Sequence, residues 1–144
     1  MTTIRLIAAT ALLGIGAVFP QVSWAESKSD ACVALSEARN ALYWMLNAKD
    51  KSALDELNAK VQAASAKLDS VLVTMTGPDA KVAADFKVIW EQFKTTREKE
   101  IIPALYKGNA NDAKKIADGV QLSRVSRMWD IMSCKAGFGS SASK

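Results

Sequence analysis

The sequence predicts an all-α protein, an up-down-up-down antiparallel four-helix bundle that follows an N-terminal signal peptide. Alanine, lysine and leucine are plentiful and β-branched runs are scarce, a balance that favours helix. The 144 residues include only three prolines and seven glycines, so few positions interrupt a helix. Apolar residues recur at steps of three and four over long stretches, which is the spacing of one helix face.

Residues 1–25 are predicted to form a secretory signal peptide. Arg5 supplies a positive charge near the start, and an apolar run follows from Leu6 to Phe19. Small residues just before Glu26 predict cleavage at that point. The alternative is an uncleaved membrane anchor, although this run is shorter than the ~20 residues that a transmembrane helix needs. Cleavage leaves a periplasmic or secreted protein with no stable membrane span.

The bundle is expected over residues 26–134. Its first helix is predicted to begin at Ser29 or Asp30, either of which can cap it, and to end near Ala48. Its inner face carries Leu35, Ala38, Leu42 and Met45. The connection to the second helix is short and polar, so the two helices should run antiparallel.

The second helix has the most regular pattern. Ser52 is expected to cap it, with Asp55 and Glu56 in the first turn, and Gly77-Pro78 should stop it. Its apolar residues follow a heptad repeat, the pattern that keeps one stripe on a partner helix. They are Leu54, Leu57, Val61, Ala64, Leu68, Val71 and Met75.

The third helix is expected from about Asp79 to Lys107. The same rhythm continues in Val82, Phe86, Ile89 and Phe93. Pro103 lies in the last turn, where it forfeits a backbone hydrogen bond, so a kink or an early end is predicted. Gly108 is placed to cap the helix.

The fourth helix is expected from Asn111 or Asp112 to Cys134, and residues 135–144 should form a flexible tail rich in glycine and serine. The apolar stripe of this helix is broad and drifts between its two halves. It comprises Ala113, Ile116, Ala117, Val120, Val125, Met128, Ile131 and Met132.

The chain has no histidine. This absence removes His-ligated haem, Glu-x-x-His di-iron sites, the common zinc enzyme sites and the Ser-His-Asp triad. No catalytic group, metal or cofactor is therefore predicted. The net charge is only +4, and the positive residues are spread among negative ones, which is typical of a solvated surface rather than of a nucleic-acid interface.

The two cysteines are predicted to form a disulfide. Cys32 lies near the start of the first helix and Cys134 at the end of the fourth, and in an up-down bundle these two places lie at the same end. An exported protein with two cysteines usually pairs them. The alternative is a redox switch or a metal site, but no Cys-x-x-Cys motif supports it.

A polar layer across the bundle is the predicted ligand site. It comprises Arg39, Arg97, Gln121 and Arg124. At ~1.5 Å per residue from the loop end, these residues fall within one or two turns of each other. Arginines at such a place can bind a carboxylate through paired hydrogen bonds. The alternative is that they lay their stems on the core and pair with nearby glutamates such as Glu98.

The region around this layer resembles a known family. It contains Trp90, Phe93 and Arg97 at steps of three and four, then EIIPAL at 100–105 and KGN at 107–109 before a further helix. This run is similar to the four-helix-bundle sensory domain of methyl-accepting chemotaxis receptors, most clearly over residues 82–132. The resemblance implies a periplasmic domain that often dimerises and binds a small molecule or a binding protein between its helices. No transmembrane helix or signalling segment follows Cys134, so a free-standing version of the module is expected.

The predicted function is therefore that of a soluble exported binding module with no enzymatic activity. It would recognise a small anionic ligand or a periplasmic partner protein, and a homodimer is one assembly that the resemblance implies. The alternative is a periplasmic chaperone-like or stress protein that acts through an exposed basic and apolar surface. A metal or haem carrier is a third class, and the missing histidines argue against it.

Overall fold

The computed structural model describes residues 24–134, and within that range the chain forms helices and short connections without a strand. This confirms the all-α class for the described part of the chain. The predicted tail and nearly all of the predicted signal peptide lie outside the described residues. Trp24 and Ala25, the last two residues of that predicted signal, belong to the first helix.

Four continuous helical segments make up the described chain. The first is α1 (Trp24–Met45) and the second is α2 (Lys51–Thr74). A 3-10 turn, η1 (Gly77–Asp79), leads into the third, which joins α3 (Ala80–Thr96), the π-helical turn η2 (Arg97–Ile101) and α4 (Ile102–Tyr106). The fourth joins α5 (Ala110–Ile116), the π-helical turn η3 (Ala117–Gln121) and α6 (Leu122–Met132).

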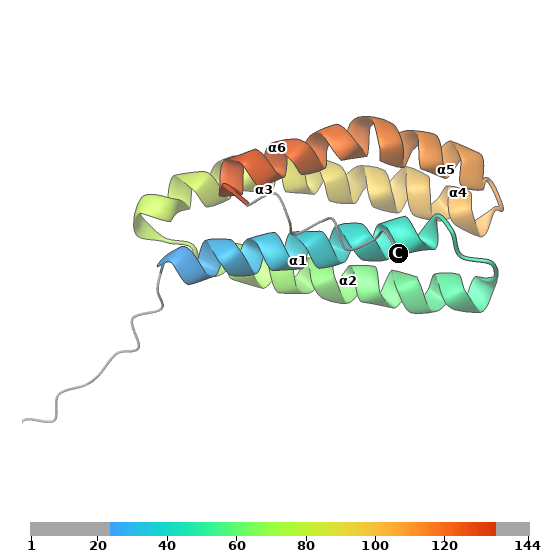
Figure 1. Cartoon of the computed structure of the whole chain (residues 1–144), viewed down its shortest axis with the longest axis horizontal. Helices are drawn as coiled ribbons and strands as arrows, with labels where there is room; N and C mark the ends of the chain where they lie inside the picture. Colours follow the sequence, from blue (N-terminus) through green and yellow to red (C-terminus); the bar gives the residue numbers. More distant parts are fainter. Residues whose placement is uncertain (1–23, 135–144) are drawn as a thin grey trace, which may run out of the picture.

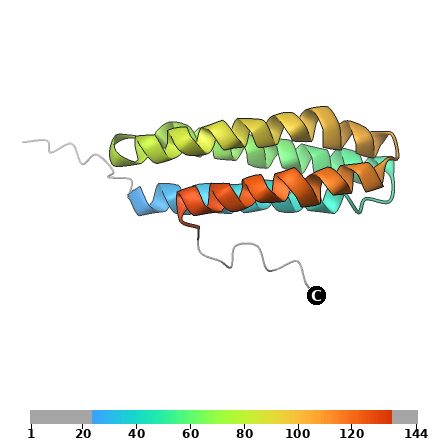
Figure 2. The ribbon, with the colours of Figure 1, turned by 90° about the horizontal axis from the view of Figure 1, so that it is seen from above.

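The four segments lie alongside one another, and the chain connects them at alternate ends (Figure 1). Seen from above, α6 lies over α1 and α3 lies beside α2 (Figure 2). Each segment therefore borders two others, and the core fills the space between them. No helix of residues 24–134 has both the length and the hydrophobicity to cross a membrane.

The ends of the first two helices differ from the prediction. α1 is already helical at Trp24, ahead of the predicted caps Ser29 and Asp30, and it ends at Met45. Asp50, not Ser52, caps α2, because its Oδ1 accepts a hydrogen bond from the backbone N–H of Ala53 at 2.8 Å. Because α2 begins two residues earlier than predicted, Asp55 and Glu56 lie beyond its first turn and not within it as expected.

The apolar faces of the first three segments lie inside, as predicted. In α1, Leu35, Ala38, Leu42 and Met45 are all at most 4% exposed. In α2 the heptad residues are buried, apart from Leu57 and Val71, which are half-buried. In α3, Phe86, Ile89, Trp90 and Phe93 fill the centre. The expected burial of Val120 is wrong, since it is 46% exposed. Val120 belongs to η3, where the wider π turn rotates the helix face, so Gln121 points inward in its place.

Pro103 does not end the third segment early, because the chain stays helical to Tyr106. The distortion occurs instead directly upstream, in η2. A proline ring clashes with the carbonyl of the preceding turn, and a wider π turn relieves that clash. Gly108 caps the segment as predicted, with a φ of 80° and its N–H donating to the carbonyl of Leu105 at 3.0 Å.

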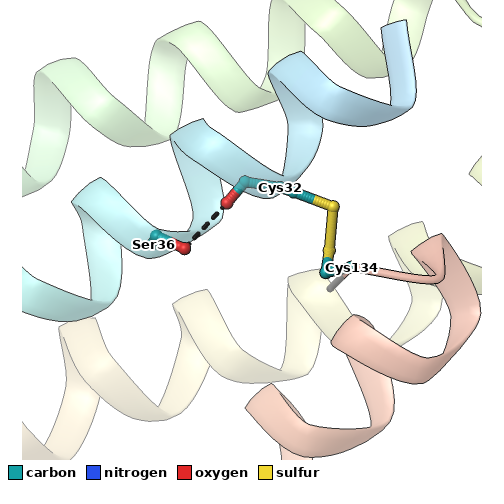
Figure 3. The surroundings of a disulfide bond; sticks show 3 residues. All are labelled: Cys32, Ser36 and Cys134. Carbon is teal, nitrogen blue, oxygen red and sulfur yellow. Dashed lines mark hydrogen bonds between the residues drawn. A yellow bond between two sulfur atoms is a disulfide. The ribbon is translucent and has the colours of Figure 1, made fainter. Parts of the chain in front are cut away.

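Two links join α1 to other segments at the end of the molecule where α6 finishes. Cys32 of α1 and Cys134 form the predicted disulfide across 102 residues, with their Cα atoms 5.7 Å apart (Figure 3). Cys134 lies just beyond the last residue of α6, not within the helix as predicted, because Ser133 adopts a left-handed conformation. Close by in the fold, Nζ of Lys28 is paired with Oδ1 of Asp79 at 2.7 Å, which joins α1 to η1.

Candidate functional site

Gln121 is the centre of the polar contacts between the third and fourth segments. Its side chain is buried at 2% exposure. Its Nε2 donates to the carbonyl of Phe93 at 2.9 Å, and its Oε1 accepts from Nη1 of Arg124 at 2.9 Å. The same Nη1 also donates to Oγ1 of Thr96 at 2.8 Å. These bonds satisfy a buried amide and hold η3 and α6 against α3.

Arg97 lies apart from this group and faces α2. It is only 1% exposed, and its Nη1 donates to Oγ of Ser65 at 2.9 Å. Its Nε and Nη2 both contact Oε1 of Glu98 at 2.8 Å, while the guanidinium lies over the rings of Trp90 and Phe93. Burial lowers the pKa of Arg97, and the hydrogen bond and charge of Glu98 oppose that shift. Arg97 therefore agrees with the alternative hypothesis for the arginines of the polar layer, in which the arginine pairs with a glutamate and belongs to the core.

Arg39 of α1 has a different environment. Its guanidinium lies over the ring of Trp129, 5.5 Å from the centroid. Among residues 27–134, no carboxylate lies within ion-pair distance of Arg39 or of Arg124. The indole N–H of Trp129 is buried, and the described residues offer it no hydrogen-bond acceptor. Arg39 and Trp129 thus carry side-chain N–H donors that have no acceptor among the described residues.

Arg39 borders a hollow of about 110 Å³ between α1, α3 and the fourth segment. Leu42 of α1, Phe93 of α3 and Val125 of α6 give it apolar walls, and Gln121 adds an amide. A cavity of ~150 Å³ holds benzene in a well-studied protein, so this hollow suits a ligand of about six non-hydrogen atoms or fewer. An arginine beside an apolar hollow of this size is an arrangement suited to a small organic anion.

The remaining charges near the hollow neutralise each other. Asp118 also lines it, and its Oδ2 is paired with Nζ of Lys114 at 2.6 Å. The pKa of Lys114 is raised, chiefly by this hydrogen bond. The ammonium also lies 5.9 Å from the ring centroid of Tyr43, another residue of the lining. With Asp118 and Lys114 paired, the charge that remains for a ligand is that of Arg39.

The structure therefore divides the predicted polar layer into two parts. Arg39 and Gln121 line the same hollow, and Arg124 is hydrogen-bonded to Gln121. Arg97 is not part of the lining. The sequence analysis did not identify Asp118 as a residue of the site. Asp118 lies four residues after Lys114 and directly before a glycine, and this i,i+4 spacing indicates an ion pair on an ordered helix surface.

No cluster of three or more metal-binding side chains occurs within the described range. Comparisons of the chain with protein-family models, with curated proteins and with solved structures find no match in any of the three.

Proposed function

We propose that the chain is an exported up-down-up-down four-helix bundle that binds a small organic anion in the hollow beside Arg39. The observation that carries this proposal is that Arg39 lines an apolar hollow and that its guanidinium has no carboxylate partner among the described residues. A cation in such a position gains a charge-assisted hydrogen bond when an anion arrives. No catalytic group has been assigned to this site, so the proposed activity is binding.

The chemistry of the lining defines the class of ligand. The carboxylate of the ligand would accept hydrogen bonds from Arg39, and its apolar part would contact Leu42, Phe93 and Val125. The volume of about 110 Å³ limits that part to a short aliphatic chain or a small ring. Short monocarboxylates, including small apolar amino acids, fit this description.

The proposed compartment is the periplasm or the exterior of the cell. Support comes from the signal-like stretch at 1–25 and from the disulfide between Cys32 and Cys134, since disulfides persist in oxidising compartments. The resemblance to chemoreceptor sensory domains suggests the biological role. In this role the protein senses an anion and presents its bound form to a periplasmic partner protein.

Thermal unfolding with a panel of short carboxylates tests the binding proposal. A ligand at about 100 times its dissociation constant adds ~2.7 kcal/mol of stability, which raises the melting temperature by several degrees. The Arg39→Ala variant should lose this rise. Arg127→Ala is the matched control, because Arg127 is an exposed arginine of α6 outside the lining.

Uncharged amides of the same acids complete the experiment. They have the same shape without the negative charge, so they should not raise the melting temperature. The proposal is wrong if no acid stabilises the protein, or if Arg39→Ala responds to the acids as the unmodified protein does.

A second function, chaperone-like protection of other proteins, is favoured by the exposed apolar side chains. Val73 is 79% exposed, Val88 62% and Trp44 52%. A protein that holds unfolded clients presents apolar surface of this kind. Light scattering of a heat-aggregating client distinguishes the two functions, because only a chaperone-like protein would suppress the scattering when no acid is present.

A further inference from the structure

The exposed aromatic side chains lie at one end of the molecule. We call it the loop end, which is formed by the connections 46–50 and 107–109 and lies opposite the disulfide (Figure 1). Tyr43 and Trp44 belong to the last turn of α1, and Tyr106 is the last residue of α4. Their exposures are 42%, 52% and 38%, and no other aromatic side chain is exposed in the part of the chain for which burial is described.

An apolar hollow of about 330 Å³ also lies at the loop end, between the two connections. Tyr106 lines it, and the buried side chains of Met45, Leu54 and Leu105 form its floor. Exposed apolar surface of this kind is typical of a site of contact with a protein or a membrane.

Two lysines at the loop end have no carboxylate partner. Lys49 lines the hollow, and Lys107 lies between Tyr106 and Gly108, which also line it. Among residues 27–134, no carboxylate lies within ion-pair distance of either ammonium group, whereas most other lysines of that range are paired. The loop end therefore keeps positive charge for a partner.

The acids nearest to the hollow are already engaged within the chain. Asp50 caps α2 through the hydrogen bond from the N–H of Ala53. Asp55 accepts a hydrogen bond from the phenol of Tyr106 at 2.6 Å and pairs with Lys51 at 3.1 Å. Because these carboxylates have partners, they compete little for Lys49, and the loop end combines exposed aromatic rings with unpaired ammonium groups.

We infer that the loop end is a docking surface for an anionic phospholipid bilayer. Tryptophan and tyrosine are enriched where proteins meet the headgroup region, because an apolar ring carries a polar N–H or O–H group. Lysines beside such a surface are attracted to anionic headgroups. In this orientation the long axis of the bundle is roughly normal to the bilayer, and the disulfide lies at the far end (Figure 1).

The distribution of the aromatic rings around the loop end favours a flat partner. Tyr43 faces the fourth segment, since Nζ of Lys114 lies 5.9 Å from its ring centroid. Trp44 lines a groove between α1 and α2, and Tyr106 contacts Asp55 of α2. Rings on different sides of one end can contact a bilayer together, whereas a ligand within one groove would contact only some of them.

Co-sedimentation with phospholipid vesicles tests the inference. The purified protein should bind vesicles of phosphatidylcholine mixed with phosphatidylglycerol, and it should bind vesicles of phosphatidylcholine alone much more weakly. Raising the salt concentration from about 0.1 M to 1 M should weaken the binding, because the screening length falls from ~10 Å to ~3 Å. Tryptophan fluorescence should shift to shorter wavelength on binding, and Trp44→Phe should lose this shift.

Single substitutions locate the contact. Lys49→Gln and Lys107→Gln should each raise the dissociation constant for the anionic vesicles roughly fivefold, since a lysine near an anionic surface contributes about 1 kcal/mol. Lys87→Gln is the matched control, because Lys87 is exposed, has no carboxylate partner among the described residues and lies in the half of α3 next to η1. Trp44→Ala should also weaken binding, whereas Val73→Ala, an exposed position at the other end of α2, should not.

The inference is overturned if the protein does not bind the anionic vesicles, or if it binds neutral and anionic vesicles equally. It is also overturned if the two lysine variants and Trp44→Ala bind as the unmodified protein does, since another part of the chain would then contact the bilayer. An equal loss in Lys87→Gln and Lys49→Gln would overturn it as well, because the attraction would then depend on the total charge and not on the loop end.

Discussion

Gln121 and Phe93 are joined by a hydrogen bond in which the buried amide of Gln121 donates to the backbone carbonyl of Phe93 at 2.9 Å. The bond connects the two segments that contain π-helical turns, η2 and η3. It also fixes one wall of the hollow beside Arg39, because both residues line that hollow. This one contact therefore contributes both to the stability of the fold and to the shape of the proposed ligand site.

Replacing Gln121 by alanine should lower the free energy of unfolding by about 1–3 kcal/mol, because the buried carbonyl of Phe93 loses its side-chain donor and the half-buried Arg124 loses one of its acceptors. Urea unfolding measures the change. Gln92→Ala is the matched control, since Gln92 is an exposed glutamine of α3, and its change should stay within about 0.5 kcal/mol. Equal losses in the two variants would contradict a bridging role for Gln121.

Arg97→Ala should lower the free energy of unfolding by about 2–5 kcal/mol, because it removes a large buried side chain together with its contacts to Ser65 and Glu98. Arg97→Lys keeps a positive charge but cannot reproduce the planar contacts of the guanidinium. Its free energy of unfolding should therefore lie between those of the alanine variant and the unmodified protein.

The same lysine variant tests whether Arg97 is separate from the proposed ligand site. Arg97 does not line the hollow, so Arg97→Lys should keep the stabilisation by short acids that Arg39→Ala loses. Loss of that stabilisation in Arg97→Lys would show that the ligand binds on the α2 side instead.

Reduction of the disulfide between Cys32 and Cys134 should lower the stability by up to ~4.7 kcal/mol, the chain-entropy value for a loop of about 100 residues. Thermal unfolding with and without a reductant measures this loss. The Cys32→Ala/Cys134→Ala variant should match the reduced protein and should not respond to the reductant. An unmodified protein that melts at the same temperature in both conditions would contradict the prediction.

Asp55 and Tyr106 join α2 to α4, with the phenol O–H donating to Oδ1 at 2.6 Å. This hydrogen bond raises the pKa of Tyr106 above its ordinary value of 10.0, because ionisation would break the bond and place two negative charges together. The tyrosine pKa is higher in the folded chain than in the unfolded chain. The contribution of this contact is therefore fully present below about pH 10 and is lost as the pH rises through the folded pKa.

Ultraviolet absorbance of the phenolate measures the titration in a Tyr43→Phe background, because the chain has only two tyrosines. Asp55→Asn should return the pKa of Tyr106 towards 10.0. Asp85→Asn is the control, since Asp85 is an exposed acid of α3 that pairs with Lys81, and it should have no effect. An unchanged titration in Asp55→Asn would contradict the assigned cause.

The number of helices and their inner faces could be predicted from the chain because they depend on local spacing. Leu35 and Leu42 share a face at any helix length, so small errors in the ends of α1 did not move them. Helix ends were less predictable, since Asp50 and Ser52 are both good caps and only the surrounding chain selects between them. The two π turns were not predicted, because no residue pattern specifies them as a heptad specifies an α-helix.

The candidate site was predicted only in part for the same reason. Counting residues gave Arg39, Arg97 and Gln121 similar heights along the bundle. The height of a residue along the bundle does not determine which neighbouring helix its side chain faces. The π turn at η3 directs Gln121 towards α3 and into the hollow, whereas Arg97 faces α2 and finds Ser65.

By itself, the sequence determined the all-α class, the inner faces of α1–α3 and the pairing of Cys32 with Cys134, since periodicity and composition express these features locally. Only the tertiary structure decided which arginine keeps an available charge. Arg97 meets Glu98 and a buried hydroxyl, while Arg39 meets a tryptophan ring and an apolar hollow. The physical reason is that the charge available to a ligand depends on the partners that other helices bring to each guanidinium.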